Sequence, residues 1–166
     1  MFDAETLAAL AAFPDRLERY LAAVPASRMM WAPQSWEGIP SETLTPLEQV
    51  CHVRDIEREG YLLRFRRLVN EENPVLASID GYALVCERDY ARDDAGRALA
   101  AFRATRAETV ELLRGLDAAQ WRRRGAFEGY GAVTVRGLAH YLCSHDHQHL
   151  SGLQWLLGKM EEAEAV

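Results

Sequence analysis

Apolar residues recur at intervals of three and four positions in four long stretches of the chain, and no segment alternates apolar β-branched residues with polar ones. The first pattern is that of amphipathic α-helices, and the missing alternation argues against β-strands. The sequence therefore predicts an all-α protein. Its main helices are expected at residues 3–24, 45–70, 93–116 and 134–157, with a shorter one at residues 82–88.

Residues that commonly begin or end helices agree with these limits. The segment Thr45-Pro46-Leu47-Glu48 combines a capping box with proline at the first helical position. Asp93 or Asp94 can cap the third helix. Thr134 can cap the last helix, which we expect to end before Gly158.

Long irregular segments join the predicted helices. Residues 25–44 carry three prolines and two tryptophans and are expected to pack across one end of the bundle, while residues 71–93 form a second crossing. Residues 121–131, with three Arg and three Gly, are predicted to form a surface loop. Pro14 either kinks the first helix or opens a second one. Together these features predict a four-helix bundle with long crossing loops and up-down-down-up connectivity.

Length and composition restrict the class of protein. The chain of 166 residues is 49% hydrophobic and 27% charged, which is ordinary for a globular protein, and we assign residues 1–166 to a single domain. A domain of this size buries roughly 70% of the surface of its unfolded chain, so it needs no metal or disulfide merely to fold. A bound metal would therefore point to function.

Charge and cysteine content disfavour several partners. The net charge is -6, from 25 acidic and 19 basic residues, and no basic stripe is present, so nucleic-acid binding is not expected. The apolar runs are too short to span a bilayer and the N-terminus lacks a basic signal region, so we expect a cytoplasmic protein without membrane contact. Three cysteines without a CxxC pair argue against a disulfide framework or a thiolate zinc site.

Helical geometry separates the five histidines. Four of them lie in the last predicted helix. An advance of roughly 100° per residue places His145 and His149 in the middle of the apolar face and His140 and His147 on the opposite face. His52, the fifth, lies on the second predicted helix. We therefore treat His140 and His147 as residues outside any site.

The pair His145 and His149 has the spacing of a helical metal chelate, because side chains four residues apart can direct both rings to one point. The alternative is a pair of core histidines satisfied by hydrogen bonds. Two adjacent polar rings in an apolar face are costly to satisfy without a common partner. With His52 as third ligand, three neutral imidazoles would leave a coordination position open for catalysis. Zinc and nickel are the expected ions, although this ligand set also accommodates iron.

Several other residues are candidates for the site. Arg106 lies on the apolar face of the third predicted helix, where we favour a structural ion pair over a clamp for an anionic substrate or thiol cofactor. Glu59 and Asp146 are either acceptors for the ring N–H groups of metal-bound histidines or solvated. Tyr141, one turn before His145, is either a hydrogen-bond donor at the open position or a core aromatic. Cys143 lies roughly 200° from His145 and is a poor ligand.

Three segments carry a resemblance to a known family. They hold one histidine early in the second long helix and an HxxxH pair in the last, and they are residues 45–57, 102–106 and 131–149. With them the chain resembles the DinB-like (DinB/YfiT) superfamily over nearly its whole length. The resemblance implies a four-helix bundle of the DinB/YfiT type, a divalent metal held by His52, His145 and His149, and a homodimer. His147, which stands between the two HxxxH ligands, departs from the minimal motif.

The resemblance leaves the reaction open, because members of this superfamily include S-transferases and an isomerase that depend on low-molecular-weight thiols. Our first hypothesis is a metal-dependent S-transferase, in which the ion lowers the pKa of a bound thiol such as mycothiol or bacillithiol for attack on a small electrophile. The alternatives are a metal-dependent hydrolase and a non-catalytic stress protein that binds a metal or small ligand. Trp31 and Trp36, which precede the His52 helix, are expected at the rim of the pocket.

Overall fold

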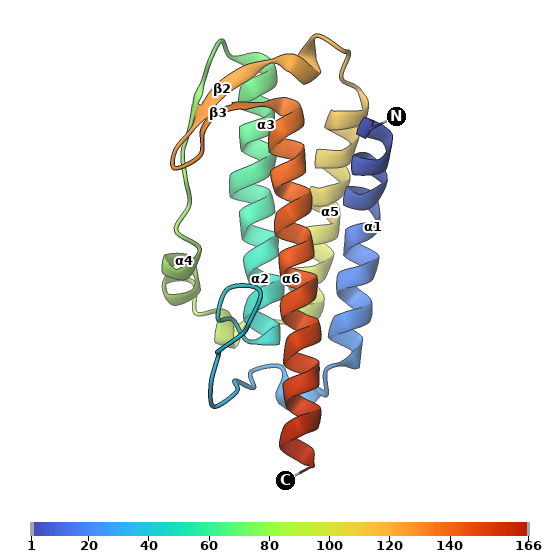
Figure 1. Cartoon of the computed structure of the whole chain (residues 1–166), viewed down its shortest axis with the longest axis vertical. Coiled ribbons are helices and arrows are strands. Elements are labelled where there is room, and N and C mark those ends of the chain that lie inside the picture. The colour runs from blue at the N-terminus through green and yellow to red at the C-terminus, as the bar shows by residue number, and fades with distance from the viewer. Residues whose placement is uncertain (1, 166) are drawn as a thin grey trace.

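The computed structural model describes residues 2–165, the first two of them by backbone alone, so both ends of the predicted 1–166 domain lie outside the described residues. The fold is a four-helix bundle with a small sheet at one end (Figure 1). Its long helices are α1 (Phe2–Ala23), α2 (Pro46–Asp55) continued by α3 (Leu62–Asn70), α5 (Ala95–Arg114) and α6 (Val135–Glu164). The prediction of a predominantly helical bundle is confirmed.

The helices follow the expected up-down-down-up connectivity. In Figure 1, α1 and α6 run down the view while α2, α3 and α5 run up it. The helix α1 packs against both α5 and α6, and α2 packs against α5. Because α3 and α5 follow one another along the chain and run in the same direction, the long connection between them must return along the bundle (Figure 1). Within residues 2–165, no helix has the length and apolar character needed to cross a membrane.

The predicted caps determine where three helices begin. Thr45 forms the capping box, since its hydroxyl accepts from the Glu48 amide and the Glu48 carboxylate accepts from the Thr45 amide at 2.8 Å. Asp94 caps α5 and Thr134 caps α6 through the same kind of bond to the amide three residues on. The sequence thus locates these helix starts because a capping bond is local.

Two predicted limits are wrong or unresolved from sequence. The helix α6 continues through Gly158 to Glu164, because Trp36 stacks on Trp155 at 6.2 Å and Arg28 donates to the Met160 carbonyl at 3.0 Å. These contacts outweigh the cost of about 1 kcal/mol for glycine in a helix. Pro14 lies inside α1 and does not open a second helix.

A π-helical turn, η2 (Ile56–Tyr61), joins α2 to α3 without breaking the helix. The amphipathic pattern does not reveal it, because one widened turn changes the helical period only locally. The turn lies in the middle of the bundle and buries both Glu57 and Tyr61. Turns of this kind frequently mark functional sites.

A small three-stranded sheet, which the sequence pattern did not predict, accompanies the helices. The strands are β1 (Val75–Leu76), β2 (Arg124–Phe127) and β3 (Gly131–Thr134), with β1 parallel and β3 antiparallel to the central β2. Segments of two to four residues are too short to show alternation, so residues 121–131 resembled a loop. The hairpin turns through two glycines with φ of +81°, Gly129 and Gly131, and buries Phe127.

The second crossing runs along the outside of α2, where Figure 1 places its short helix α4 (Gly81–Glu87). Asp55 anchors this crossing: it accepts from Tyr90 at 2.8 Å, pairs with Arg88 at 2.8 Å and also pairs with Arg54. Burial opposes ionisation of Asp55, but hydrogen bonds from Arg54, Tyr90 and Arg88 outweigh it and lower its pKa from 3.8 to about 2.

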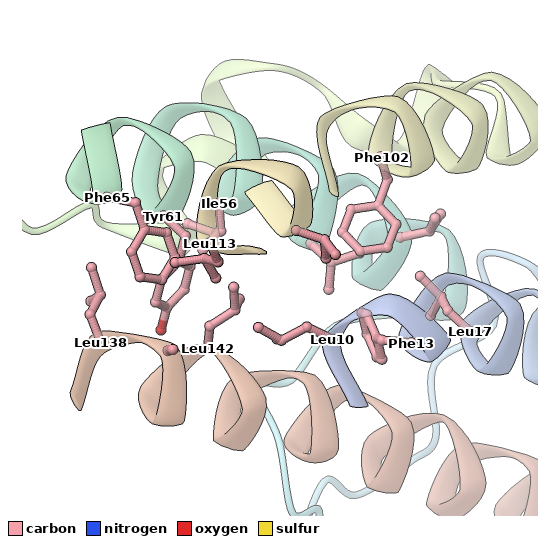
Figure 2. Close-up of a cluster of buried hydrophobic side chains, with 14 of the residues drawn as sticks. Leu10, Phe13, Leu17, Ile56, Tyr61, Phe65, Phe102, Leu113, Leu138 and Leu142 are labelled. Atoms are coloured by element: carbon pink, nitrogen blue, oxygen red, sulfur yellow. The ribbon is translucent and has the colours of Figure 1, made fainter. Parts of the chain in front are cut away.

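The core fills the space between the four helices. In Figure 2, Leu10, Phe13 and Leu17 of α1 lie opposite Phe102 of α5, while Leu138 and Leu142 of α6 face Tyr61 and Phe65. These side chains are almost fully removed from solvent. The prediction that a chain of this length builds its own apolar core agrees with this packing.

Arg106 lies buried within this core, 2% exposed, and its Cζ atom is 5.2 Å from the ring centre of Phe13 and 5.0 Å from that of Phe102. Its guanidinium makes five hydrogen bonds: two to Glu57, two to Asp146 and one to the Leu10 carbonyl. An arginine has five N–H donors, so none is left for another ligand. The structural ion pair that the sequence favoured is present, and the alternative role in cofactor binding is corrected.

Truncation of Arg106 should destabilise the fold severely, because Arg106→Ala leaves the carboxylates of Glu57 and Asp146 buried without a cation. We expect a loss of about 3–5 kcal/mol in the free energy of unfolding, measured by urea denaturation. Arg103→Ala is the matched control on the same helix, since Arg103 pairs at the surface with Asp15 and Glu18 and should cost less than about 1 kcal/mol. Equal losses in the two variants would contradict this account.

Asp55 should make stability depend on acid pH. Because its folded pKa is depressed, its contribution is fully present above pH 3.8, the ordinary value, and is lost as pH falls toward about 2. We therefore expect urea midpoints of the wild type to fall between pH 4 and pH 2 more steeply than those of Asp55→Asn. Parallel pH profiles of the two proteins would show that the anchor does not act through ionised Asp55.

Candidate metal centre

Three histidine side chains converge in the interior of the bundle. His52 comes from α2, and His145 and His149 come from adjacent turns of α6. The Nε2 atom of His145 lies 3.3 Å from Nε2 of His52 and 3.1 Å from Nε2 of His149. His52 and His149 are almost fully buried, while His145 is partly exposed. The spacing on α6 and the packing of α2 bring together the residues that the sequence nominated.

A carboxylate completes the cluster. Glu42, from the first crossing, places Oε2 at 3.6 Å from Nε2 of His149, and one ligand atom from each of the four residues lies within 4.8 Å of every other. Glu42 was not among the residues predicted from the sequence. In the sequence, Glu42 is an acidic residue three positions before the cap of the His52 helix. That position does not show which way the irregular segment turns or where the side chain lies.

Gln49 connects this loop to the histidines. Its side-chain oxygen lies 2.8 Å from Nδ1 of His149, and its amide nitrogen contacts the Leu44 carbonyl and the Ser41 hydroxyl at 3.5 Å each. An acceptor at Nδ1 makes that nitrogen the donor, so the lone pair of Nε2 points into the cluster. Gln49 therefore supplies the orienting contact that was expected from Glu59 or Asp146.

Two glycines permit the close approach of the covering segments. A Cβ atom at Gly152, one turn beyond the last histidine, would lie 2.1 Å from the Ser41 hydroxyl, so only glycine lets the first crossing lie against α6 here. A Cβ atom at Gly81 would lie 2.5 Å from Cε1 of His52. The start of α4 thus covers the ring of His52 directly.

The environment keeps the three imidazoles neutral. Burial, followed by repulsion from neighbouring cationic groups, holds the pKa of His145 and His149 well below the usual 6.5. Burial also lowers the pKa of His52, although the charges of Glu42 and Asp55 oppose this shift. Neutral imidazole is the form that binds metals, so all three rings are in the correct state at neutral pH.

The donor set fits a divalent transition metal. Nitrogens bound at 2.0–2.1 Å to one tetrahedral ion lie about 3.3 Å apart, close to both separations measured here. The Oε2 atom of Glu42 is buried without a hydrogen-bond partner among the described residues, and a cation would satisfy it. Three imidazoles and one carboxylate suit zinc or nickel better than calcium or magnesium, which prefer oxygen.

A small cavity opens beside the cluster. Its volume is about 120 Å³, and His52, His145 and Glu42 form part of its wall. Apolar and aromatic side chains form most of the remainder: Ile56, Tyr61, Ile79, Phe127 and Tyr130. Tyr61 brings its ring to 5.8 Å from that of His145, and burial raises its pKa above the usual 10. A substrate that enters this cavity would contact the ligand residues directly.

Other predicted participants lie elsewhere. Both oxygens of Glu59 accept from Arg88, at 2.9 and 2.6 Å, which corrects its expected role beside the histidines. Asp146 is committed to Arg106. Tyr141 contacts the ring of Tyr130 at 5.3 Å but does not line the cavity, where Tyr61 takes the place expected for it.

The tryptophans and the remaining sequence candidates also fall outside the cavity. Trp36 stacks on Trp155 near the end of α6, and Trp31 lines a different cavity, together with Lys159, so the expected tryptophan rim is wrong. His147 is exposed, with Nδ1 at 2.7 Å from the Cys143 carbonyl. The thiol of Cys143 contacts the Thr6 carbonyl at 3.8 Å and does not join the cluster. The crossing that carries the tryptophans contributes Glu42 instead.

Substitution of each clustered histidine by alanine should remove bound metal, because three donors hold an ion much less tightly than four. We expect His52→Ala, His145→Ala and His149→Ala, purified without a histidine tag, to contain less than half the zinc or nickel of the wild type by elemental analysis. His147→Ala is the matched control and should keep it. Full occupancy in His52→Ala, or equal loss in His147→Ala, would refute the site. Far-ultraviolet circular dichroism should remain helical after chelation.

Comparisons with known proteins agree with the fold described above. The family model of the DinB superfamily matches residues 5–152. The solved structure of YfiT from Bacillus subtilis, reported as a probable metal-dependent hydrolase with an unusual four-helix bundle topology, superimposes with a TM-score of 0.84 at 21% identity. The match covers 96% of this chain and 87% of YfiT. No curated protein matches the chain. The chain, with its bundle and its histidine cluster, belongs to the DinB superfamily.

Proposed function

We propose that this protein is a metal-dependent hydrolase that acts on a small substrate in the cavity beside the histidine cluster. One observation carries the proposal: three neutral imidazole nitrogens and the unsatisfied oxygen of Glu42 converge on one point, and His52, His145 and Glu42 line the cavity beside it. An open, partly buried donor set of this kind is typical of catalytic metal sites. The reported hydrolase character of YfiT supports the same choice, although at 21% identity it establishes the fold alone.

The ion, when bound, would supply a Lewis acid that polarises a substrate oxygen and makes a water molecule more acidic. The chain supplies the remaining functions. His52, His145 and His149 hold the ion, and Gln49 fixes the orientation of His149. Glu42 either joins them as a fourth ligand or accepts a proton at Oε2 as a general base. Ile79 and Phe127 exclude bulk water from the cavity.

Glu42 changes the balance between hydrolysis and thiol transfer. The sequence ranked transfer first because three neutral ligands leave an ion its full charge, which favours a bound thiolate. A carboxylate in the cluster reduces that positive charge and repels a second anion, whereas it can accept a proton from water. Hydrolysis therefore ranks first. Thiol transfer is the second candidate, supported by aromatic walls that suit an uncharged electrophile.

Other properties expected from the sequence stay predictions. They are the identity of the ion as zinc or nickel, a homodimeric assembly, a cytoplasmic location and the absence of nucleic-acid and membrane partners. The coarser conclusion, a DinB-superfamily bundle that carries a histidine and glutamate cluster, does not depend on them.

The two enzyme candidates differ in their need for a thiol. We expect zinc- or nickel-loaded protein to hydrolyse members of a panel of small esters, amides and lactones without added thiol, measured by product release. Glu42→Gln should lower kcat about 100-fold or more, as loss of a general base does, and His149→Ala should abolish turnover.

His147→Ala is the control and should retain wild-type turnover, since His147 is exposed and outside the cluster. Turnover that appears only with added bacillithiol or mycothiol would replace hydrolysis by thiol transfer. If the wild type turns over substrates no faster than His149→Ala, both with and without added thiol, the remaining interpretation is a non-catalytic metal-binding protein.

A further inference from the structure

Arg64 is a buried cation in the wall of the same cavity, and no acidic side chain balances it. The residue is 6% exposed and lies on α3, one turn beyond the π-helical turn. Its Nε and Nη2 atoms donate to a single acceptor, the Ala77 carbonyl, at 3.1 and 2.9 Å. Within residues 4–165, no Asp or Glu forms an ion pair with it.

Comparison with other arginines shows that a buried guanidinium without a carboxylate partner is unusual in this protein. Arg106, the other arginine buried to this degree, has two carboxylate partners. Arg67, one turn further along α3, donates to a carbonyl of the same crossing segment, Val75, but also pairs with Glu71 at 2.7 Å. A buried charge without a counter-ion is costly, so its retention needs an explanation beyond the fixing of one carbonyl.

The packing around Arg64 holds its guanidinium in place but does not neutralise it. Its Cζ atom lies 4.5 Å from the ring centre of Phe127 and 5.5 Å from that of Tyr61. Its Nη1 atom lies against Gly60, where a Cβ atom would come within 2.8 Å. Two aromatic rings, a carbonyl and a glycine thus orient a planar group whose charge remains available to the cavity.

The cavity places this charge near the candidate metal centre. Arg64 shares a volume of about 120 Å³ with His52, His145 and Glu42. That volume is below the roughly 300–1,000 Å³ of pockets that take drug-sized ligands, so the cavity fits a small molecule. A molecule that reaches the histidines must therefore hold its charged group within a few atoms of its reacting bond.

We infer that Arg64 binds the carboxylate of a short carboxylic acid that is the substrate of this site. The inference rests on the proposed function for the identity of the reacting centre, but the anion subsite itself does not. A carboxylate is the favoured anion because it is planar, matches the guanidinium fork and carries one charge. A phosphate dianion would bring more negative charge toward Glu42 in the same small volume.

Propionate and its neutral counterpart propionamide test this subsite. On the full chain as purified, with its metal content measured, titration by NMR should show that propionate binds and propionamide does not. Arg64→Gln should weaken propionate binding at least about tenfold, as loss of a charged hydrogen-bond partner does. Arg67→Gln, the matched control one turn away, should bind propionate as the wild type does.

A second variant removes the dependence on the folding of Arg64→Gln. Gly60→Ala adds a methyl group 2.8 Å from Nη1, at the far end of the long Arg64 side chain, and should displace the guanidinium without loss of the fold. It should also weaken propionate binding. Circular dichroism and the melting temperature of each variant report on folding.

Separate readouts distinguish failure of this inference from failure of the proposed function. Three results would overturn the inference. Arg64→Gln could bind propionate as tightly as the wild type, or propionate binding could depend only on the ion and disappear on chelation. The third is stronger binding of inorganic phosphate than of propionate. No detectable binding of propionate by the wild type would overturn it too. If the wild type binds no metal but still binds propionate through Arg64, the proposed function would be overturned and the anion subsite would remain.

Discussion

The buried contact between Arg106 and the carboxylates of Glu57 and Asp146 is the interaction on which the rest of the bundle depends. It joins α5 to the π-helical turn and to α6, and through the Leu10 carbonyl it also reaches α1. Each member would be costly to bury alone, so the helices are stable together only in the register that satisfies all of them. That register includes His145, the residue before Asp146.

The candidate metal centre adds a second set of constraints, supplied by segments outside the helices. The first crossing brings Glu42 to the histidines, held by Gln49 and admitted by the absence of a side chain at Gly152. The second crossing covers His52 at Gly81 and is tied to α2 through Asp55. The two irregular segments therefore enclose a site whose main donors come from rigid helices, which favours a well-defined geometry.

Charge divides the interior into two regions with different consequences. Around Arg106 every donor has an acceptor, and the group has only a structural role. Around Arg64 and the histidines, cationic and neutral donors face a cavity, and an oxygen of Glu42 lacks a partner. Such incomplete satisfaction is unfavourable for folding and is retained mainly at sites that bind a ligand. This contrast supports the assignment of function to the histidine cluster rather than to the neighbouring Arg106 cluster.

The sequence by itself determined the four long helices, three of their caps and the three histidines, because helical period and capping bonds depend on residues a few positions apart. It also placed Arg106 on an apolar face. Tertiary structure alone decided the short sheet, the π-helical turn and the choice of Glu42, Tyr61 and Arg64 over Glu59 and Tyr141. These features depend on how irregular segments lie against distant helices, through close contacts such as Gly152 with Ser41. No local pattern encodes such contacts, since they arise between residues about 100 positions apart.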